Sequence, residues 1–116
     1  MDPESIREFC LSLPHATEGV QWENDLLFRI GGKMFAVLAL EPSHGVVFCF
    51  KTTPEEFAEL TERPGIIPAP YLARYHWVGL QSLDALDPGD LKEGVEASYQ
   101  MVRAKLPKKV RAQFET

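Results

Sequence analysis

The 116-residue sequence has no apolar run of about 18 residues, so no segment of it is predicted to span a bilayer. Cysteine is scarce: only Cys10 and Cys49 are present, and the lack of a C-x-x-C pair excludes a zinc ribbon or a dithiol redox motif. We expect both to be small buried residues. Wholesale disorder is also excluded, because 45% of the residues are hydrophobic and 25% are charged, as in an average soluble domain. The length predicts one domain over residues 1–116.

Motifs for catalysis and for cofactor binding are missing as well. The sequence contains no G-x-S-x-G and no G-x-G-x-x-G. The stretch GGK at residues 31–33 lacks the spacing of a phosphate loop, and a predicted strand follows it instead of a helix. His15, His44 and His76 form no pair with metal-ligand spacing, so we expect surface histidines. These absences predict a protein that is not an enzyme and has no catalytic residues, metal or cofactor.

Charge is unevenly distributed along the chain. The net charge is −5, from 12 basic and 17 acidic residues. Residues 103–116 hold five basic residues and one acid, a net of +4, so residues 1–102 carry 7 − 16 = −9. An acidic body repels polyanions unless its basic groups gather on one face. The N-terminal MDPESIREF is acidic and lacks the basic and apolar regions of a signal peptide, which predicts a cytoplasmic protein with no membrane partner.

The N-terminal third predicts a helix followed by strands. Asp2 and Pro3 are typical of an N-cap and first helical position, and an apolar stripe from Ile6 to Leu13 continues to Pro14. Val20 and Trp22 are expected to point inward from a short edge strand. Two apolar runs at 26–30 and 33–40 flank Gly31-Gly32, the pattern of a tight hairpin, and 46–50 is a third strand. The 33–40 run is apolar on both faces, which predicts a central strand with material packed on each side.

The second half predicts two more helices and one strand. Thr53 and Glu56 form a capping box for a helix that ends near Glu62. Residues 66–75 hold two prolines and are expected to be an ordered loop, and 76–83 to be a strand. A long helix should begin at Asp87-Pro88, break at Pro107 and continue as a short helical tail over 108–114; its inward stripe comprises Leu91, Val95, Tyr99, Val102 and Leu106.

The element order is therefore α-β-β-β-α-β-α, with one more short strand near 18–23 or 82–86. Strands joined mostly by hairpins and interrupted by helices predict an α+β fold of two layers, in which helices pack against an antiparallel sheet.

Aromatic and basic residues are the candidates for ligand binding. Aromatic rings interleaved with cations can stack on bases and bind phosphates. The alternative is that the tryptophan rings cover the open edge of the core while the lysines only confer solubility. The residues concerned are Trp22, Tyr71, Tyr75 and Trp77, together with Lys33, Lys51, Arg74 and the cluster from Lys105 to Arg111.

Several short motifs occur together and in order over nearly the whole chain. They are E-x-x-x-W at 18–22, G-K-M-F-A at 32–36, F-K at 50–51, P-A-P-Y at 68–71, H-W at 76–77 and S-Y-x-x-V-x-x-K-L-P-K-K at 98–109. Jointly they resemble the MmcQ/YjbR family of small bacterial proteins. The resemblance implies a two-layer α+β fold similar to CyaY-like proteins and type III secretion chaperones. It also implies a DNA-binding role by analogy with a double-wing arrangement, and it carries over no catalytic residues.

Three functional hypotheses follow. The first is a non-enzymatic DNA-binding module, in which the phosphate contacts would come from Lys33, Lys51, Lys105, Lys108, Lys109 and Arg111. The second is a protein-interaction or chaperone-like module, which should expose an apolar patch. The third is a small-molecule pocket lined by Trp22, Tyr71, His76 and Trp77. We expect a monomer.

Overall fold

The protein was analysed as a computed structural model, which describes residues 1–22, 24–41 and 45–114. Its α-helices are α1 (Pro3–Ser12), α2 (Pro54–Leu60), α3 (Pro88–Ala104) and α4 (Lys108–Arg111). The strands are β1 (Thr17–Gln21), β2 (Asp25–Ile30), β3 (Lys33–Ala39), β4 (Phe48–Lys51), β5 (Ile66–Pro68) and β6 (Trp77–Leu80). Short 3-10 turns follow at η1 (Ala73–Tyr75), η2 (Leu83–Ala85) and η3 (Ala112–Phe114).

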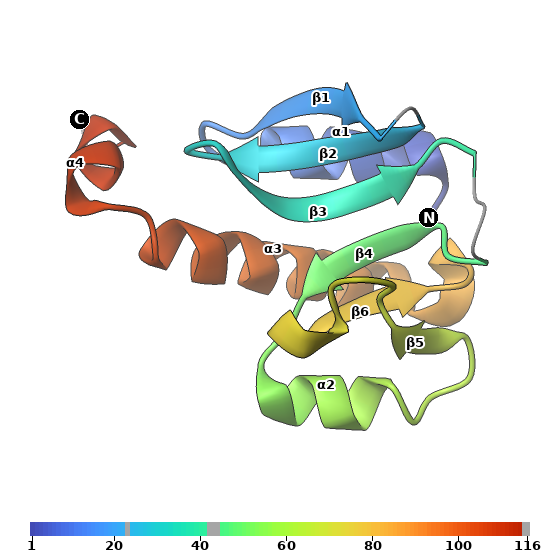
Figure 1. The fold of residues 1–116 in the computed structure, drawn as a ribbon. Coiled ribbons are helices and arrows are strands. Elements are labelled where there is room, and N and C mark those ends of the chain that lie inside the picture. Colours follow the sequence, from blue (N-terminus) through green and yellow to red (C-terminus); the bar gives the residue numbers. More distant parts are fainter. Residues whose placement is uncertain (23, 42–44, 115–116) are drawn as a thin grey trace.

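The strands form one antiparallel sheet. Over the described residues it has six strands in the order β1-β2-β3-β4-β6-β5 (Figure 1). The hairpin across Gly31 and Gly32 is confirmed, and 33–40 supplies the central strand β3 as predicted. A bulge interrupts β3, because Phe28 pairs with Ala36 while Arg29 pairs with Met34. The extra residue, Phe35, is fully buried in the main core.

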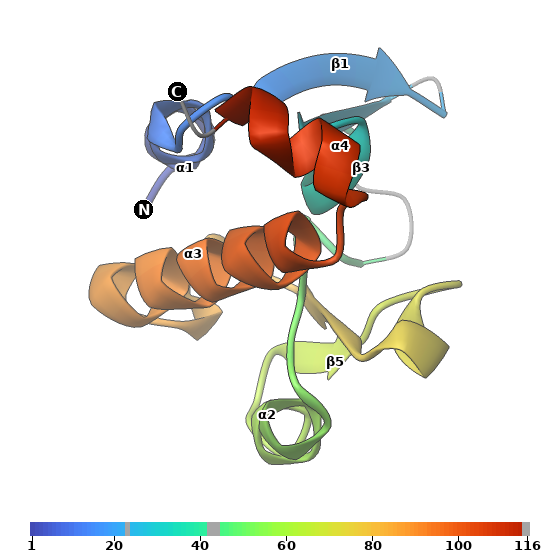
Figure 2. The ribbon, with the colours of Figure 1, turned by 90° about the vertical axis from the view of Figure 1, so that its left-hand side faces the viewer.

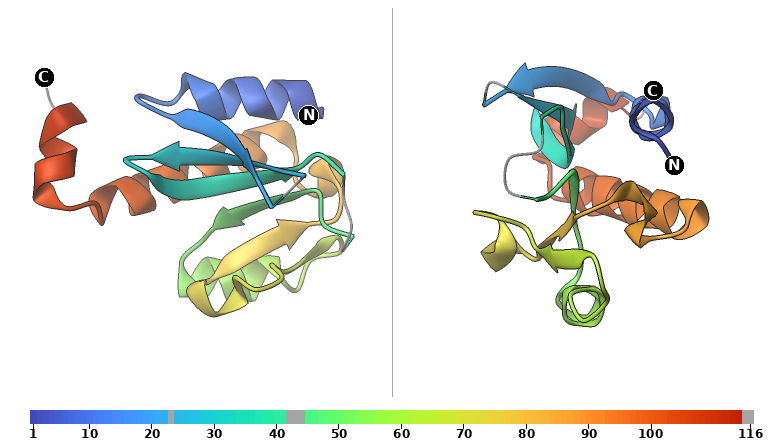
Figure 3. Two further views of the ribbon diagram at one scale, coloured as in Figure 1. Left: turned by 45° about the horizontal axis from the view of Figure 1, so that its top comes forward. Right: turned by 90° about the vertical axis from the view of Figure 1, so that its right-hand side faces the viewer.

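The helices α1 and α3 cover one face of the sheet, as the end-on views show (Figures 2 and 3). The main core lies between these helices and the sheet, and its largest fully buried side chains include Phe28, Phe35, Phe50 and Tyr99. The predicted α+β class and two-layer arrangement are therefore confirmed. Among the described residues, no α-helix covers the other sheet face, and α2 lies beside β5 and β6 at one edge.

Side chains begin the three longer helices as the sequence predicts. Asp2, Thr53 and Asp87 each accept a hydrogen bond from a backbone N–H three residues further along, at 2.8, 3.2 and 2.8 Å. These bonds satisfy amide groups that have no partner within the helix. Proline follows each cap, where its missing N–H costs nothing.

Several predictions are corrected by the structure. Val20 and Trp22 do not point inward: their side chains are 58% and 61% exposed. Trp22 lies just after β1 and has a φ of 51°, so the alternation of side chains between the two faces of the strand does not extend to it. Residues 66–75 are not only loop, because Ile66 is buried in the edge strand β5, and Pro68 is tolerated there without an N–H to donate.

The extra short strand is β1, the first of the two predicted positions, whereas 82–86 contains the 3-10 turn η2. Cys10 is fully buried as expected, but Cys49 is only half-buried and lies on the helix-free sheet face. His15 is exposed, His76 is half-buried, and His44 lies outside the described residues.

Candidate functional site

The helix-free face of the sheet has its own small apolar cluster. Leu27, Val37, Ala69 and Trp77 are buried there, away from the main core. Val37 of β3 pairs with Cys49 of β4, so the two side chains lie next to each other on this face. Strand residues alternate between faces, and the neighbours Phe48 and Phe50 belong to the main core. Without a helix on this side, part of the apolar surface remains accessible.

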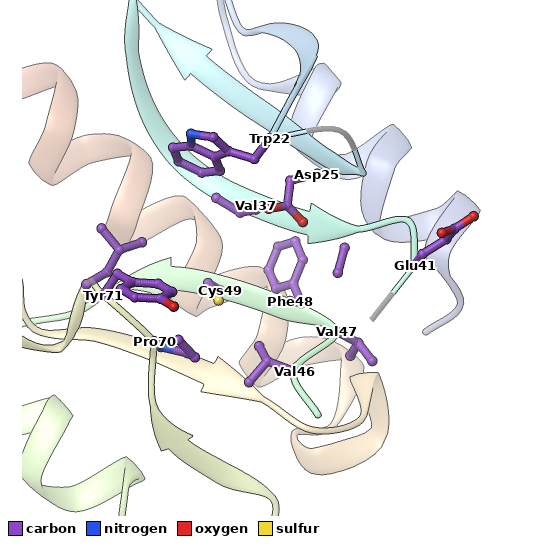
Figure 4. A pocket seen from close by; sticks show the side chains of 12 residues that line it. Trp22, Asp25, Val37, Glu41, Val46, Val47, Phe48, Cys49, Pro70 and Tyr71 are labelled. Carbon is purple, nitrogen blue, oxygen red and sulfur yellow. The ribbon is translucent and has the colours of Figure 1, made fainter. Parts of the chain in front are cut away.

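A groove of about 530 Å³ crosses this face (Figure 4). Trp22, which follows β1, stands on one side, and Tyr71, in the loop between β5 and β6, stands on the other. We call it the aromatic groove. Its described lining residues are Trp22, Asp25, Val37, Ala39, Glu41, Val46, Val47, Phe48, Cys49, Pro70, Tyr71 and Leu72.

Both aromatic residues adopt a backbone conformation that is unusual for their type. Trp22 has a φ of 51° and Tyr71 a φ of 66°, in the left-handed region. Such a residue costs about 1–3 kcal/mol, and bulky residues in this state occur preferentially at binding sites. The rings remain 61% and 89% exposed, so burial of these rings does not offset the cost. The fold thus holds two large rings at the surface at the expense of its own stability.

Asp25 supplies negative charge inside the aromatic groove. Its carboxylate points into the groove between Trp22 and Phe48 (Figure 4). The same carboxylate acts on Cys49: burial, together with the charge of Asp25, raises the pKa of the Cys49 thiol to about 12. Cys49 is therefore a neutral thiol at pH 7, and with Val37 it contributes to the apolar floor.

A second feature lies at the end of the molecule where the β2–β3 hairpin and the C-terminal part of α3 lie beside α4 (Figures 1 and 2). We call it the basic end. Lys33 follows the hairpin turn, and Lys51 is the last residue of β4. The basic end carries basic residues from the hairpin, the end of β4 and the C-terminal segment: Lys33, Lys51, Lys105, Lys108, Lys109 and Arg111. Arg74 belongs to η1, next to Tyr75, whose carbonyl oxygen binds Lys51.

Lys51 occupies the middle of the basic end. Its Nζ donates a hydrogen bond of 2.8 Å to the carbonyl oxygen of Tyr75. Burial and the neighbouring charge of Lys105 lower the pKa of the Lys51 amine. Arg74 lies over the Tyr75 ring, with 4.8 Å from its guanidinium carbon to the ring centroid. Since the Tyr75 ring is 50% exposed, the basic end combines cations with one accessible aromatic surface.

The basic C-terminal segment packs on the body of the protein. Leu106 is 4% exposed, and Val110 and Phe114 contact the main core. Gly31 permits this contact, because a Cβ there would lie 2.6 Å from a methyl carbon of Leu106, and its φ is 58°. The Phe114 ring stacks on His15 at 4.7 Å between centroids. The tail cations therefore have fixed positions relative to Lys33 and Lys51.

The four residues of the predicted pocket do not line one cavity. Trp22 and Tyr71 line the aromatic groove, whereas His76 and Trp77 are not among its lining residues. The His76 ring contacts Phe57 of α2 edge-on, with 5.7 Å between centroids. Trp77 is 4% exposed in the small cluster beneath the sheet face.

Sequence reasoning missed Asp25, Val37 and Cys49 as groove residues. A signal was available for two of them, because the β3 and β4 segments are apolar at consecutive positions and so leave hydrophobic side chains on both faces. No local pattern places Asp25 opposite the loop that carries Tyr71. In the described part of the chain, no group of three or more His, Cys, Asp or Glu is arranged to hold a metal ion. No helix among the described residues is both long and apolar enough to cross a membrane.

Comparisons with known proteins are consistent with this architecture. The family model described as YjbR matches residues 11–101. A crystal structure of the Deinococcus radiodurans protein DR2400, described as a DUF419 domain, has a TM-score of 0.82 and 26% identity, covering 96% of this chain and 86% of the other. A Pseudomonas syringae protein solved by structural genomics has a TM-score of 0.75 and 22% identity, with 88% and 99% coverage. No curated protein matches the sequence.

Proposed function

We propose that this protein, which belongs to the YjbR family, is a non-enzymatic module that binds the phosphate backbone of DNA at its basic end. The observation that carries the proposal is that the C-terminal segment packs on the hairpin turn at Gly31, which brings the tail cations to the hairpin that carries Lys33, and that Lys105 lies near enough to Lys51 for its charge to act on it. This grouping of cations matters because the chain as a whole has a net charge of −5. A polyanion can approach such a protein only where cations outnumber carboxylates locally.

The distribution of charge along α3 also favours an approach of DNA to the basic end. Asp87 and Asp90 lie at its N-terminal end, and Arg103 and Lys105 at its C-terminal end. A helix of 17 residues is about 26 Å long, so the two groups are separated by more than one Debye length at physiological salt. The helix dipole favours the same arrangement of charges. DNA would therefore meet the basic end with the acidic end directed away.

The proposal predicts a steep dependence on salt. About four phosphate contacts would lower the affinity for a mixed-sequence duplex roughly 100-fold between about 50 and 200 mM salt. Fluorescence anisotropy of a labelled duplex measures this slope. Binding that is equally strong at both salt concentrations, or no binding at the lower one, would contradict the proposal.

Charge reversal tests which residues make the contacts. Lys109→Glu should weaken DNA binding and reduce the salt slope by about one unit, because one phosphate contact is lost. Lys92→Glu is the matched control: Lys92 is an exposed lysine of α3 near the ring of Phe9, close to the acidic end. It makes the same change in net charge outside the basic end and should alter binding much less. Equal effects of the two variants would show that only net charge matters.

The protein-interaction hypothesis and the cytoplasmic location stay predictions. The exposed side chains of Val20, Trp22, Leu40 and Tyr71 favour the protein-interaction hypothesis, because they leave apolar surface in contact with water.

A further inference from the structure

We propose that the aromatic groove binds a small organic cation with a flat apolar body, of the arylalkylamine class. The inference is independent of DNA binding, since none of the groove's lining residues belongs to the basic end. Shape, charge and backbone conformation each point to this ligand class.

The size and surface of the groove fit a small molecule. Its volume of about 530 Å³ falls within the range of about 300–1,000 Å³ that is typical of small-molecule sites. Val37, Ala39 and Cys49 provide a floor made mainly of carbon and sulfur, with the Cys49 thiol kept neutral. The Trp22 and Tyr71 side chains stand on opposite sides of that floor (Figure 4). A flat apolar body placed between them would cover surface that is now exposed to water.

The charge of the groove selects a cation. Asp25 points its carboxylate into the groove, whereas Glu41 lies at one end with its carboxylate directed away from the two rings (Figure 4). Among the described lining residues there is no lysine or arginine. The faces of tryptophan and tyrosine rings also attract cations, and tryptophan does so most strongly. An ammonium group near Asp25 and Trp22 would therefore gain from both, whereas phosphates and carboxylates would be repelled.

The backbone provides a third, independent argument. Trp22 and Tyr71 come from distant parts of the chain, and both have a positive φ that their side chains disfavour. A fold that needed these rings only for stability would bury them, and it does not: they are 61% and 89% exposed. Rings held in place before the ligand arrives lose less conformational freedom on binding.

The test uses 2-phenylethylamine as the probe and 3-phenylpropionate as its anionic counterpart with a similar apolar body. NMR of the ¹⁵N-labelled protein reports on the two indole N–H groups separately. We expect the amine to shift the Trp22 indole signal saturably, in the millimolar range expected for so small a ligand. Trp77 is buried beneath the groove and does not line it, so its indole signal should move less than that of Trp22. The acid should bind at least tenfold more weakly.

Two variants locate the site. Asp25→Asn should weaken amine binding at least tenfold, and Tyr71→Ala should also weaken it. The Tyr71 ring is 89% exposed, so its removal should leave the fold intact. The control Asp90→Asn removes the same charge at the start of α3, on the helix-covered side of the sheet, and should bind the amine as the unaltered protein does.

Three results would overturn the inference. They are the absence of a saturable shift with the amine, equal binding of the acid, and unchanged amine binding in both Asp25→Asn and Tyr71→Ala. A fourth result would replace the small molecule by a peptide: binding of N-acetyl-Phe-Lys-amide more than tenfold tighter than that of the amine. DNA binding measured on the same variants should not change, so failure here and failure of the DNA proposal are distinguishable.

Discussion

The hydroxyl of Ser98 donates a hydrogen bond of 2.6 Å to the carbonyl oxygen of Phe35. The hydroxyl oxygen of Ser98 in turn accepts a hydrogen bond of 3.0 Å from the backbone N–H of Lys51. The last pair of the ladder between β3 and β4 is Ala36 and Phe50. Phe35 and Lys51 are the next residues of the two strands beyond that pair. Ser98, fully buried on α3, thus links two strands just beyond the point where their direct pairing ends. The contact connects the bulge residue Phe35 and the basic residue Lys51 to the same side chain of α3.

We predict that Ser98→Ala destabilises the protein by about 1–3 kcal/mol, because a buried N–H and a buried carbonyl lose their shared partner. Urea denaturation measures the change. Ser12→Ala is the control, since the Ser12 hydroxyl is exposed on α1 and bonds only to the carbonyl oxygen of Phe9. A loss at Ser98 no larger than that at Ser12 would contradict the role assigned to the contact.

Gly94→Ala should destabilise the protein, although alanine is the better helix former by about 1 kcal/mol. A Cβ at Gly94 would lie 2.8 Å from a ring carbon of Phe50, which is buried and cannot move away freely. Overpacking of this kind typically costs about 1–3 kcal/mol. In the control Gly89→Ala, the nearest atom is the exposed side chain of Asp87 at 3.3 Å, so we expect little loss. Thermal unfolding of both variants measures the difference, and a Gly94→Ala protein as stable as the original would show that α3 can shift.

Both thiols should be nearly inert in the folded protein at pH 8. Burial raises the pKa of Cys10 to about 12, and burial with the charge of Asp25 raises that of Cys49 to about 12. Compared with a thiol of pKa 9.0, the thiolate fraction at pH 8 is lower by roughly a thousandfold. Reaction with a disulfide reagent should accelerate as pH rises and again on unfolding in urea.

The two cysteines should differ in rate. Cys49 is half-buried in the aromatic groove and should react before Cys10, which is fully buried. Asp25→Asn removes one of the two causes of the raised pKa and should increase the rate at Cys49 only. Rapid labelling of both thiols at pH 8 in the folded protein would contradict the burial described here. Mass spectrometry of the labelled peptides assigns each rate to its residue.

Local signals in the sequence were sufficient for the elements and the fold class. Asp2, Thr53 and Asp87 begin helices because a side-chain oxygen reaches an amide only three residues away. Gly31 and Gly32 identify their hairpin because few other residues accept a positive φ. The prediction of a loop over 66–75 was wrong for the strand β5. The two prolines of the segment suggested a loop more strongly than Ile66 and Ile67 suggested a strand, and the pairing of β5 with β6 is a long-range contact that no local pattern reveals.

The candidate sites depended on contacts between distant segments. The five lysines and one arginine named for DNA were identifiable by charge alone, but only the packing of Leu106 and Val110 against Gly31 places the tail cations beside the hairpin that carries Lys33. Of the four residues named for a pocket, Trp22 and Tyr71 line the aromatic groove, whereas Trp77 is buried in the cluster beneath it and His76 packs on Phe57. The local sequence determines where a strand or helix begins, because capping hydrogen bonds and turn preferences act over only a few residues. Which side chains share a surface is decided by the topology, in which neighbours in space are far apart along the chain.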